Sequence, residues 1–147
     1  MKTQANILTI AGSDSCCGAG IQADLKTFAA HEVYGTSVIT NVTAQNSLGV
    51  HKIHILPLDI IEAQIKSVFD DISISAVKIG MLNTVGTVEL VAKLLKVYQP
   101  EHIIIDPVMI SSSGKRLLAH SAYKVLVNNL LPLATLITPN IPEAACL

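Results

Sequence analysis

The sequence predicts an α/β protein with a doubly wound, mostly parallel sheet and helices on both faces. Short apolar runs that suit buried strands alternate along the chain with segments of helical periodicity, which is the pattern of βαβ units. Hydrophobic residues make up 50% of the chain, but only 3% of residues are aromatic. A core of Ile, Leu, Val and Ala is typical of parallel sheets that are covered on both faces. A strand, a glycine-containing loop and a helix over residues 7–28 begin this pattern.

The strands are predicted where β-branched and other apolar residues gather between turn signals. They are expected at residues 7–11, 34–43, 50–56, 76–80, 102–106 and 135–138. The run at 50–56 alternates apolar and polar side chains, which favours a half-exposed edge strand. The first strand is expected to end in a loop of small residues over 12–20, and the second in a polar loop over 44–49.

The helices are predicted from apolar residues that recur three, four or seven positions apart. Their marker residues are Ile21, Leu25 and Phe28; Ile61, Ile65, Val68 and Ile72; Val88, Val91, Leu95 and Tyr98; and Tyr123, Leu126 and Leu130. Asp59 with Glu62 is the expected N-terminal cap of the second helix, and Asn83 or Thr84 is that of the third. Residues 139–143 open one more helix.

The length of 147 residues suits one domain, which buries roughly 70% of its unfolded surface. The sequence contains no internal repeat, low-complexity tract or linker. It stops at Leu147, a few residues into the last predicted helix, where a complete domain seldom ends. The expectation is therefore a single, incomplete domain over residues 1–147, truncated on its carboxyl-terminal side.

Charge and cysteine content exclude several classes of protein. Ten basic and eleven acidic residues give a formal net charge of −1, so neither nucleic acid nor an anionic membrane is an expected partner. The apolar runs are far shorter than the roughly 20 residues of a membrane span, and the start of the chain lacks a signal-peptide core. Adjacent Cys16 and Cys17, with Cys146 far away, form neither a disulfide framework nor a CxxC motif. We therefore expect a reduced, cytoplasmic protein.

The loop after the first strand satisfies the loose dinucleotide pattern GxGxxG/A at Gly18, Gly20 and Ala23. The loop is longer than the tight turn of that fingerprint, and no acidic residue lies between Glu32 and Asp59 to bind a ribose. No Gly-Lys-Ser/Thr follows either, which excludes a Walker A loop. A metal site at His51 and His54 is also disfavoured, because their odd spacing on a strand sends them to opposite faces.

Polar side chains and one methionine gather near the carboxyl ends of the predicted strands. Asp14 and Asp24 flank the first loop, and the others stand at or after later strand ends: Gln45, Met81, Asp106, Asn140 and Glu143. Because the carboxyl ends of the strands of a doubly wound sheet converge on one crevice, we expect a ligand site there. Asp106 ends an all-isoleucine run and needs a cation or a hydrogen-bond partner. Taken singly, Asp14 and Asn140 have the alternative of capping helices, and Glu143 of being an ordinary surface charge.

Six short motifs stand in order along nearly the whole chain. They are AGSDSxxGAGIQADLK from Ala11, TAQNSLG from Thr43, VKIGML from Val77, IDPVM from Ile105, SG from Ser113 and TPNIPE from Thr138. In this order and spacing they resemble the hydroxymethylpyrimidine and phosphomethylpyrimidine kinase family of thiamine biosynthesis, within the ribokinase-like superfamily. The resemblance is to the amino-terminal portion of that family and implies its fold.

The resemblance implies ATP-dependent phosphorylation of 4-amino-5-hydroxymethyl-2-methylpyrimidine, then of its monophosphate, with Mg²⁺. The complete protein is expected to be a homodimer with this small molecule as its substrate. Gln45 suits an aminopyrimidine, since a carboxamide presents an acceptor beside a donor. By resemblance, the rest of the substrate site is Gly12, Ala19, Asp24, Met81 and Val108. The same resemblance places Asn140 and Asp106 beside the nucleotide phosphates, and Asp106, Thr138 and Glu143 in the magnesium region.

Two departures from the family pattern matter. The family usually has Ser-Gly or Gly-Gly where this chain has Cys16 and Cys17, and Cys17 is strained if its position needs a positive φ. The family's Gly-Thr-Gly-Cys segment, whose cysteine acts as the base, is absent from the chain, and Cys146 is not preceded by glycines. No catalytic residue is therefore assigned here, because the family's base falls beyond Leu147. The rival interpretations are a pyridoxal-type vitamin kinase, a non-catalytic pyrimidine-binding fragment and an unstable truncation product.

Overall fold

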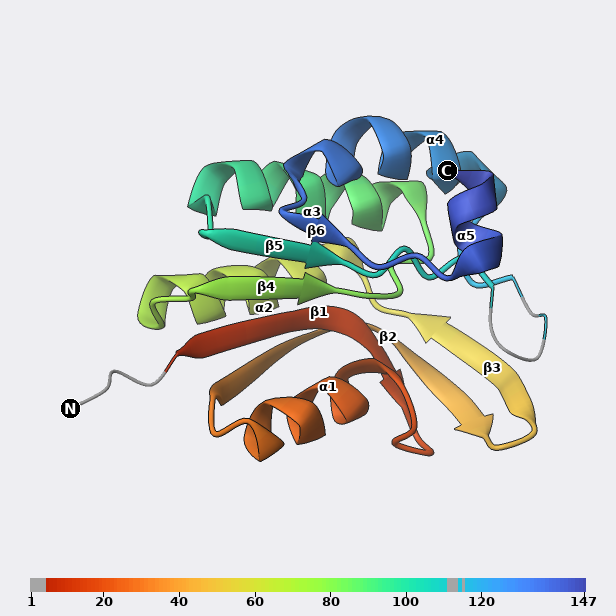
Figure 1. The fold of residues 1–147 in the computed structure, drawn as a ribbon, viewed down its shortest axis with the longest axis horizontal. Helices are drawn as coiled ribbons and strands as arrows, with labels where there is room; N and C mark the ends of the chain where they lie inside the picture. The colour runs from red at the N-terminus through yellow and green to blue at the C-terminus, as the bar shows by residue number, and fades with distance from the viewer. Residues whose placement is uncertain (1–4, 111–113, 115) are drawn as a thin grey trace.

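The computed structural model describes residues 5–110, 114 and 116–147, and within them the chain forms a six-stranded sheet (Figure 1). The strands stand in the order β3-β2-β1-β4-β5-β6. Their bounds are β1 (Asn6–Asp14), β2 (Tyr34–Asn46), β3 (Gly49–Ile55), β4 (Ala76–Ile79), β5 (His102–Ile105) and β6 (Leu136–Ile137). Neighbouring strands are parallel except β2 and β3, which pair antiparallel. The predicted α/β class and mostly parallel sheet are confirmed.

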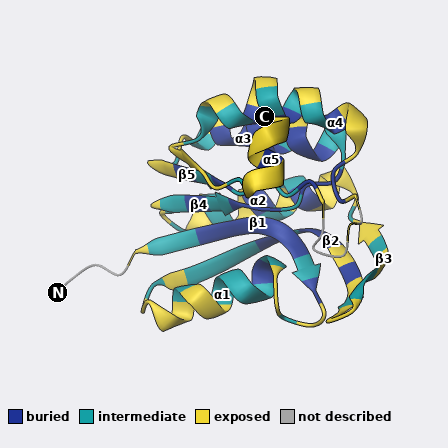
Figure 2. Ribbon diagram, turned by 45° about the vertical axis from the view of Figure 1, so that its right-hand side comes forward, coloured by how far each residue is buried: buried dark blue, intermediate teal, exposed yellow. Residues whose placement is uncertain are grey.

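The helices cover both faces of the sheet. They are α1 (Gly20–Ala30), α2 (Leu58–Asp71), α3 (Val85–Tyr98), α4 (His120–Val125) and α5 (Ile141–Cys146). Helix α1 packs on β1 and β2, whereas α2, α3 and α4 pack on one another across the other face (Figures 1 and 2). The chain runs from β1 outward to β2 on one side and later to β4 on the other. The strand order thus reverses between β1 and β4, where open α/β sheets bind ligands.

The core is aliphatic, as the composition predicts. The central strands contribute fully buried Leu8, Ile10, Val77 and Ile79. Figure 2 shows the buried middle of β1 as a dark blue stretch. The helices over this face contribute buried residues at helical spacing, namely Ile61, Ile65, Val88 and Val91. Each such side chain stabilises the fold by roughly 1.5–3 kcal/mol relative to an exposed one. Among the described residues, no helix combines the length and apolar character that crossing a bilayer requires.

The strands β1 and β2 are longer than the sequence predicts. Strand β1 continues through Gly12 and Ser13 to Asp14, after a register shift between Ala11 and Ser13. Strand β2 continues into the segment that we expected to be a polar loop. The expected loop starts were wrong because small polar residues pair through their backbones here. The Thr43 hydroxyl supports this pairing by donating to the Ser13 carbonyl oxygen at 3.0 Å.

The helix ends confirm some predicted caps and contradict another. Thr84 caps α3 by accepting the backbone N–H of Thr87, as expected. Helix α2 begins after Pro57 without a side-chain cap, and Asp59 lies inside its first turn, so the Asp59 prediction was wrong. After α4, residues Leu126–Leu130 form a π-helical turn and Leu131–Leu133 a 3₁₀ turn, where a continuous α-helix was expected. Ser113 of the predicted SG motif lies outside the described residues.

Candidate functional site

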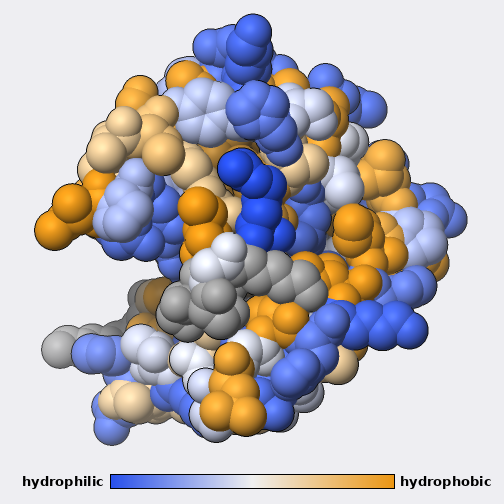
Figure 3. All heavy atoms as spheres, turned by 90° about the vertical axis from the view of Figure 1, so that its right-hand side faces the viewer, coloured by the Kyte–Doolittle hydropathy of each residue, from blue (hydrophilic) through white to orange (hydrophobic). Residues whose placement is uncertain are grey.

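A cavity of about 400 Å³ lies at the carboxyl edge of the sheet, where the order of the strands reverses. Every substrate, phosphate and metal candidate from the sequence lines it: Gly12, Ala19, Asp24, Gln45, Met81, Asp106, Val108, Thr138, Asn140 and Glu143. Figure 3 views the molecule from the side toward which the parallel strands run, and hydrophilic and hydrophobic side chains are interspersed there. The convergence expected from the strand ends is therefore present, while the role of each residue stays a prediction.

The loop between β1 and α1 forms one rim of the cavity and is organised by Asp14. The Asp14 carboxylate is almost fully buried and accepts the backbone N–H groups of Cys16, Gly18 and Ala19 at 2.8–2.9 Å. Asp14 is thus the anchor of this loop rather than a helix cap. Cys17 has a φ of 59°, so the strained conformation anticipated for this position is present.

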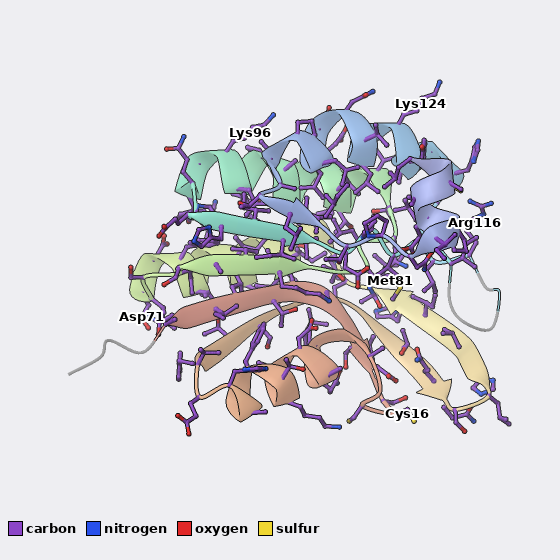
Figure 4. All side chains as sticks on the ribbon, viewed as in Figure 1. Cys16, Asp71, Met81, Lys96, Arg116 and Lys124 are labelled. Atoms are coloured by element: carbon purple, nitrogen blue, oxygen red, sulfur yellow. The ribbon has the colours of Figure 1, made fainter. Side chains whose placement is uncertain are left out.

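Glycine at position 12 lets three segments approach one another. A Cβ atom there would lie 2.5 Å from Oδ1 of Asn41 and 2.9 Å from Cε of Met81. Both distances are shorter than van der Waals contact, so a side chain would push Met81 and the buried Asn41 away. Figure 4 shows Met81 at the carboxyl end of β4, beside this rim. The absence of a side chain at Gly12 thus keeps the cavity floor open.

Gln45 is held in place through its backbone. The Ser15 hydroxyl accepts the Gln45 N–H at 3.0 Å and donates to the Gln45 carbonyl oxygen at 2.8 Å. The Gln45 side chain then reaches the cavity, with its Oε1 atom 3.4 Å from the Thr43 hydroxyl. The loop after β1 therefore fixes the backbone of Gln45, from which the carboxamide extends into the cavity.

Lys78 is the functional candidate that the sequence reasoning missed. Its ammonium lies 3.1 Å from Oδ1 and 3.2 Å from Oδ2 of Asp24, and 3.9 Å from Oδ2 of Asp106. The fully buried Thr9 donates its hydroxyl to Asp24 Oδ2 at 2.6 Å. A sequence signal was available, because a lysine between Val77 and Ile79 interrupts an apolar strand and a buried charge needs a partner.

Asp106 is the acidic side chain most suited to a cation. Burial raises the pKa of its carboxyl above the ordinary 3.8, the nearby Lys78 ammonium lowers it in part, and the Glu143 and Asp24 carboxylates raise it further. A divalent cation would offset this repulsion, and carboxylate oxygens are hard ligands of the kind Mg²⁺ prefers. The described residues contain no group of three acidic, His or Cys side chains that could hold an ion by itself. The donor set fits a magnesium ion that also needs waters and phosphate oxygens.

Glu143 is buried, so the alternative of an ordinary surface charge was wrong. Its Oε2 atom accepts the Asn140 N–H at 3.0 Å and its Oε1 atom accepts the Met109 N–H at 3.3 Å. The Asn140 side chain in return accepts the Glu143 N–H at 2.9 Å, which completes a capping box at the start of α5. The helix-cap alternative for Asn140 is therefore correct, and it leaves Asn140 and Glu143 lining the cavity.

A second cavity of about 650 Å³ adjoins the first and shares Ile110, Asn140 and Glu143 with it. Its other lining residues come mainly from α4, α5 and the segment before α4, and many of them are apolar. Arg116, labelled in Figure 4, brings a positive charge to this side. The capping box of α5 thus forms the partition between a polar cavity and a more apolar one.

Comparison with known proteins identifies a family. The phosphomethylpyrimidine kinase family model matches residues 14–147. A Haemophilus influenzae protein named hydroxymethylpyrimidine/phosphomethylpyrimidine kinase is 52% identical over 147 residues, which are 100% of this chain and 55% of that protein. An Escherichia coli protein of the same name is 51% identical over 97% of this chain and 53% of its own length. The chain thus spans about half the length of these curated relatives.

A solved structure shares the same fold. The crystal structure of a phosphomethylpyrimidine kinase from Clostridium difficile is 53% identical, with a TM-score of 0.90 over 96% of this chain and 61% of that one. A Bacillus subtilis pyridoxal kinase in complex with ADP is 42% identical, with a TM-score of 0.85 over 97% of this chain and 53% of that one. These similarities confirm the ribokinase-like architecture expected from the six motifs.

Proposed function

We propose that this chain, which belongs to the phosphomethylpyrimidine kinase family, takes part in a reaction of thiamine biosynthesis. That reaction is the ATP-dependent phosphorylation of 4-amino-5-hydroxymethyl-2-methylpyrimidine and of its monophosphate. One observation carries the proposal: residues from five of the six motifs line one cavity. The relatives are nearly twice as long as this chain. We therefore propose that residues 1–147 supply the pyrimidine site and part of the phosphate site of one larger domain, and that the base lies outside them.

The aminopyrimidine ring fits between the two rims of the cavity. The Gln45 carboxamide pairs with the exocyclic amine and the adjacent ring nitrogen, because it presents an acceptor and a donor side by side. Met81 packs on the ring, and Asp24 with the backbone at Gly12, Ala19 and Val108 completes the site. The cavity volume of about 400 Å³ lies within the range of small-molecule sites.

The phosphate side of the reaction is proposed for the opposite part of the cavity. Asp106 is the first candidate for holding Mg²⁺ and Thr138 the second, while Asn140 lies near the nucleotide phosphates; all three residues line the cavity. Both Glu143 oxygens already accept backbone N–H groups, so we assign Glu143 to the same region as an indirect, charge-contributing neighbour. When bound, magnesium supplies charge neutralisation for the transferring phosphoryl group.

The residues of this chain contribute mainly by positioning. Phosphoryl transfer asks little covalent chemistry of a protein, and correct alignment of the two reactants supplies much of the rate. Holding the ring at Gln45 and Met81 points its hydroxymethyl group toward the Asp106 side of the cavity. Val108 and Leu117 contribute apolar walls to the same cavity. No side chain of this chain is assigned the role of base.

A chimera tests this assignment. It joins this chain to the portion of the Haemophilus influenzae relative that the chain does not match, and ATP-dependent phosphorylation is followed with the pyrimidine, its monophosphate and pyridoxal as acceptors. We expect transfer to both pyrimidines and a loss of about tenfold or more in kcat/KM for Gln45→Leu, which leaves the ring amine unpaired. Preferred transfer to pyridoxal would favour the rival vitamin kinase. Binding without transfer by the chimera would favour the non-catalytic fragment.

Three wider expectations remain predictions. They are a cytoplasmic location, a homodimer of the complete protein and the absence of a nucleic-acid partner. The nearly balanced charge of the sequence supports the last of them. Size-exclusion chromatography with light scattering on the chimera measures the oligomeric state directly.

A further inference from the structure

Lys78 joins two carboxylates that the proposed function assigns to different parts of the cavity. Its ammonium contacts both oxygens of Asp24 at 3.1 and 3.2 Å and lies 3.9 Å from Asp106. The side chains are 22% exposed for Lys78, 15% for Asp24 and 36% for Asp106. These are partly desolvated charges in a concave site, where ion pairs are screened less than on an open surface.

The contacts fix the orientation of Asp24. Its Oδ2 atom accepts the Thr9 hydroxyl and the ammonium, and its Oδ1 atom lies within ion-pair distance of the same ammonium. Thr9 is fully buried in β1, so it holds one oxygen from beneath the cavity. Among the described side chains, Lys78 is the one in contact with the Oδ1 atom of Asp24, so its ammonium limits the remaining rotation of the carboxylate.

The cavity lining carries more acidic than basic side chains, so Lys78 has several carboxylates to balance. Asp14, Asp24, Asp106 and Glu143 line the cavity, and Lys78 is the single Lys or Arg among the described lining residues. Gly80 follows closely, and a Cβ at that position would lie 3.2 Å from the ammonium. The Lys78 side chain therefore packs against the backbone at Gly80 and forms part of the cavity wall.

We propose that Lys78 is a positioning residue, which holds the Asp24 carboxylate in the orientation that the pyrimidine requires and ties it to Asp106 on the phosphate side. This inference rests on the proposed function for the identity of the ligand. Removing the ammonium frees Asp24 to rotate and leaves two neighbouring carboxylates uncompensated. Affinity for the pyrimidine should then fall on the order of tenfold or more, since a charge-assisted hydrogen-bond network loses its donor.

Calorimetric titration of the 147-residue chain with 4-amino-5-hydroxymethyl-2-methylpyrimidine tests the proposal. Lys78→Met should weaken binding about tenfold or more, and Lys78→Arg, which keeps the charge and the donors, should recover most of the affinity. Lys96→Met is the matched control, because Lys96 lies in the last turn of α3, on the helical layer above the sheet and well apart from Met81 in Figure 4. Equal affinity of wild type and Lys78→Met would overturn the proposal.

A structural measurement separates this inference from the proposed function. The ¹³C signal of the Asp24 carboxyl group should move in Lys78→Met and return in Lys78→Arg, with no ligand present. If the wild-type chain does not bind the pyrimidine, the proposed substrate assignment fails and this signal alone decides the inference. An unmoved signal then overturns it. If Lys78→Met does not fold, Lys78→Gln replaces it, because a neutral amide keeps a donor near Asp24 but removes the charge.

Discussion

At the scale of single residues, Cys17 carries a conformational cost that another residue can remove. Its φ of 59° lies in the left-handed region, which costs an L-residue roughly 1–2 kcal/mol and costs glycine little. Its backbone is nevertheless held there, because its N–H donates to the Asp14 carbonyl oxygen at 3.0 Å and its own carbonyl accepts the Lys26 ammonium at 3.0 Å. The surrounding hydrogen bonds thus impose the strain.

Cys17→Gly should therefore raise the free energy of unfolding by roughly 0.5–1 kcal/mol, after the greater freedom of glycine in the unfolded chain is subtracted. Urea denaturation under reducing conditions measures the change. Cys16→Gly is the matched control and should lower stability, since Cys16 does not have a positive φ. A stability loss in Cys17→Gly as large as that in Cys16→Gly would show that the thiol contributes more than the strain costs.

Asp106 should make stability depend on pH in a defined direction. Burial raises the pKa of its carboxyl in the folded state above the ordinary 3.8, so the folded state binds this proton more tightly than the unfolded state does. The stability contribution of this group accordingly falls as the pH rises from about 3.8 through the raised pKa, and stays lower above it. Asp106→Asn should remove this fall and be the more stable protein at pH 7.

Chemical denaturation of wild type and Asp106→Asn across pH 3–8 measures this difference. Asp71→Asn serves as the control, because Asp71 lies at the end of α2 and at the far side of the molecule from Met81 in Figure 4. Parallel stability curves for wild type and Asp106→Asn would contradict the raised pKa. The same variant should lose the proposed magnesium-dependent activity, so stability and function oppose each other at this position.

At the scale of elements, one hydroxyl joins the loop after β1 to the end of β2. Ser15 makes hydrogen bonds to both the N–H and the carbonyl of Gln45, which lies 30 residues away in the sequence. Each such bond contributes about 1 kcal/mol. Because the contact is exposed, water can replace part of it, and its main effect is to hold the position of Gln45 against the loop.

Ser15→Ala should lower the free energy of unfolding by about 1 kcal/mol. It should also weaken pyrimidine binding, because the backbone of Gln45 loses its hydrogen bonds to the loop after β1. Ser15→Thr keeps the hydroxyl and should retain affinity. Ser121→Ala, at an exposed position of α4, is the matched control. Calorimetry of the three variants with the pyrimidine measures the effect. Unchanged affinity in Ser15→Ala would mean that Gln45 is positioned without the hydroxyl.

Local sequence patterns predicted some helices and strands correctly and missed others. Helical periodicity predicted α1, α2 and α3, because a buried stripe such as Ile61 and Ile65 recurs every turn. The extensions of β1 and β2 were missed, since Ser13 and Gln45 are held by tertiary partners that local propensity does not include. The π-helical turn after α4 was also missed, because Leu126 and Leu130 fit ordinary helical spacing. Pairings between distant segments are absent from any window of sequence.

At the scale of the whole molecule, the sheet topology explains why the location of the site could be predicted from the sequence. Parallel strands all present their carboxyl ends to one edge, so Asp106 and Asn140, which are far apart in the chain, face one cavity with Asp24. This topological rule predicts which residues line the cavity, but it does not predict the hydrogen bonds and ion pairs that they form. It placed Glu143 at the cavity without showing that both of its oxygens are occupied, and it passed over Lys78, which precedes the end of its strand.

The most direct test of the central claim, that this cavity is an aminopyrimidine site, follows the side-chain NH₂ signals of Gln45 in ¹⁵N–¹H spectra. The 147-residue chain is titrated with 4-amino-5-hydroxymethyl-2-methylpyrimidine. We predict that the Gln45 carboxamide signals shift together with the backbone amides of Gly12 and Ala19, on one saturating curve. Shifts confined to the second cavity, at Tyr123 and Arg116, or no shifts at all, would contradict the claim.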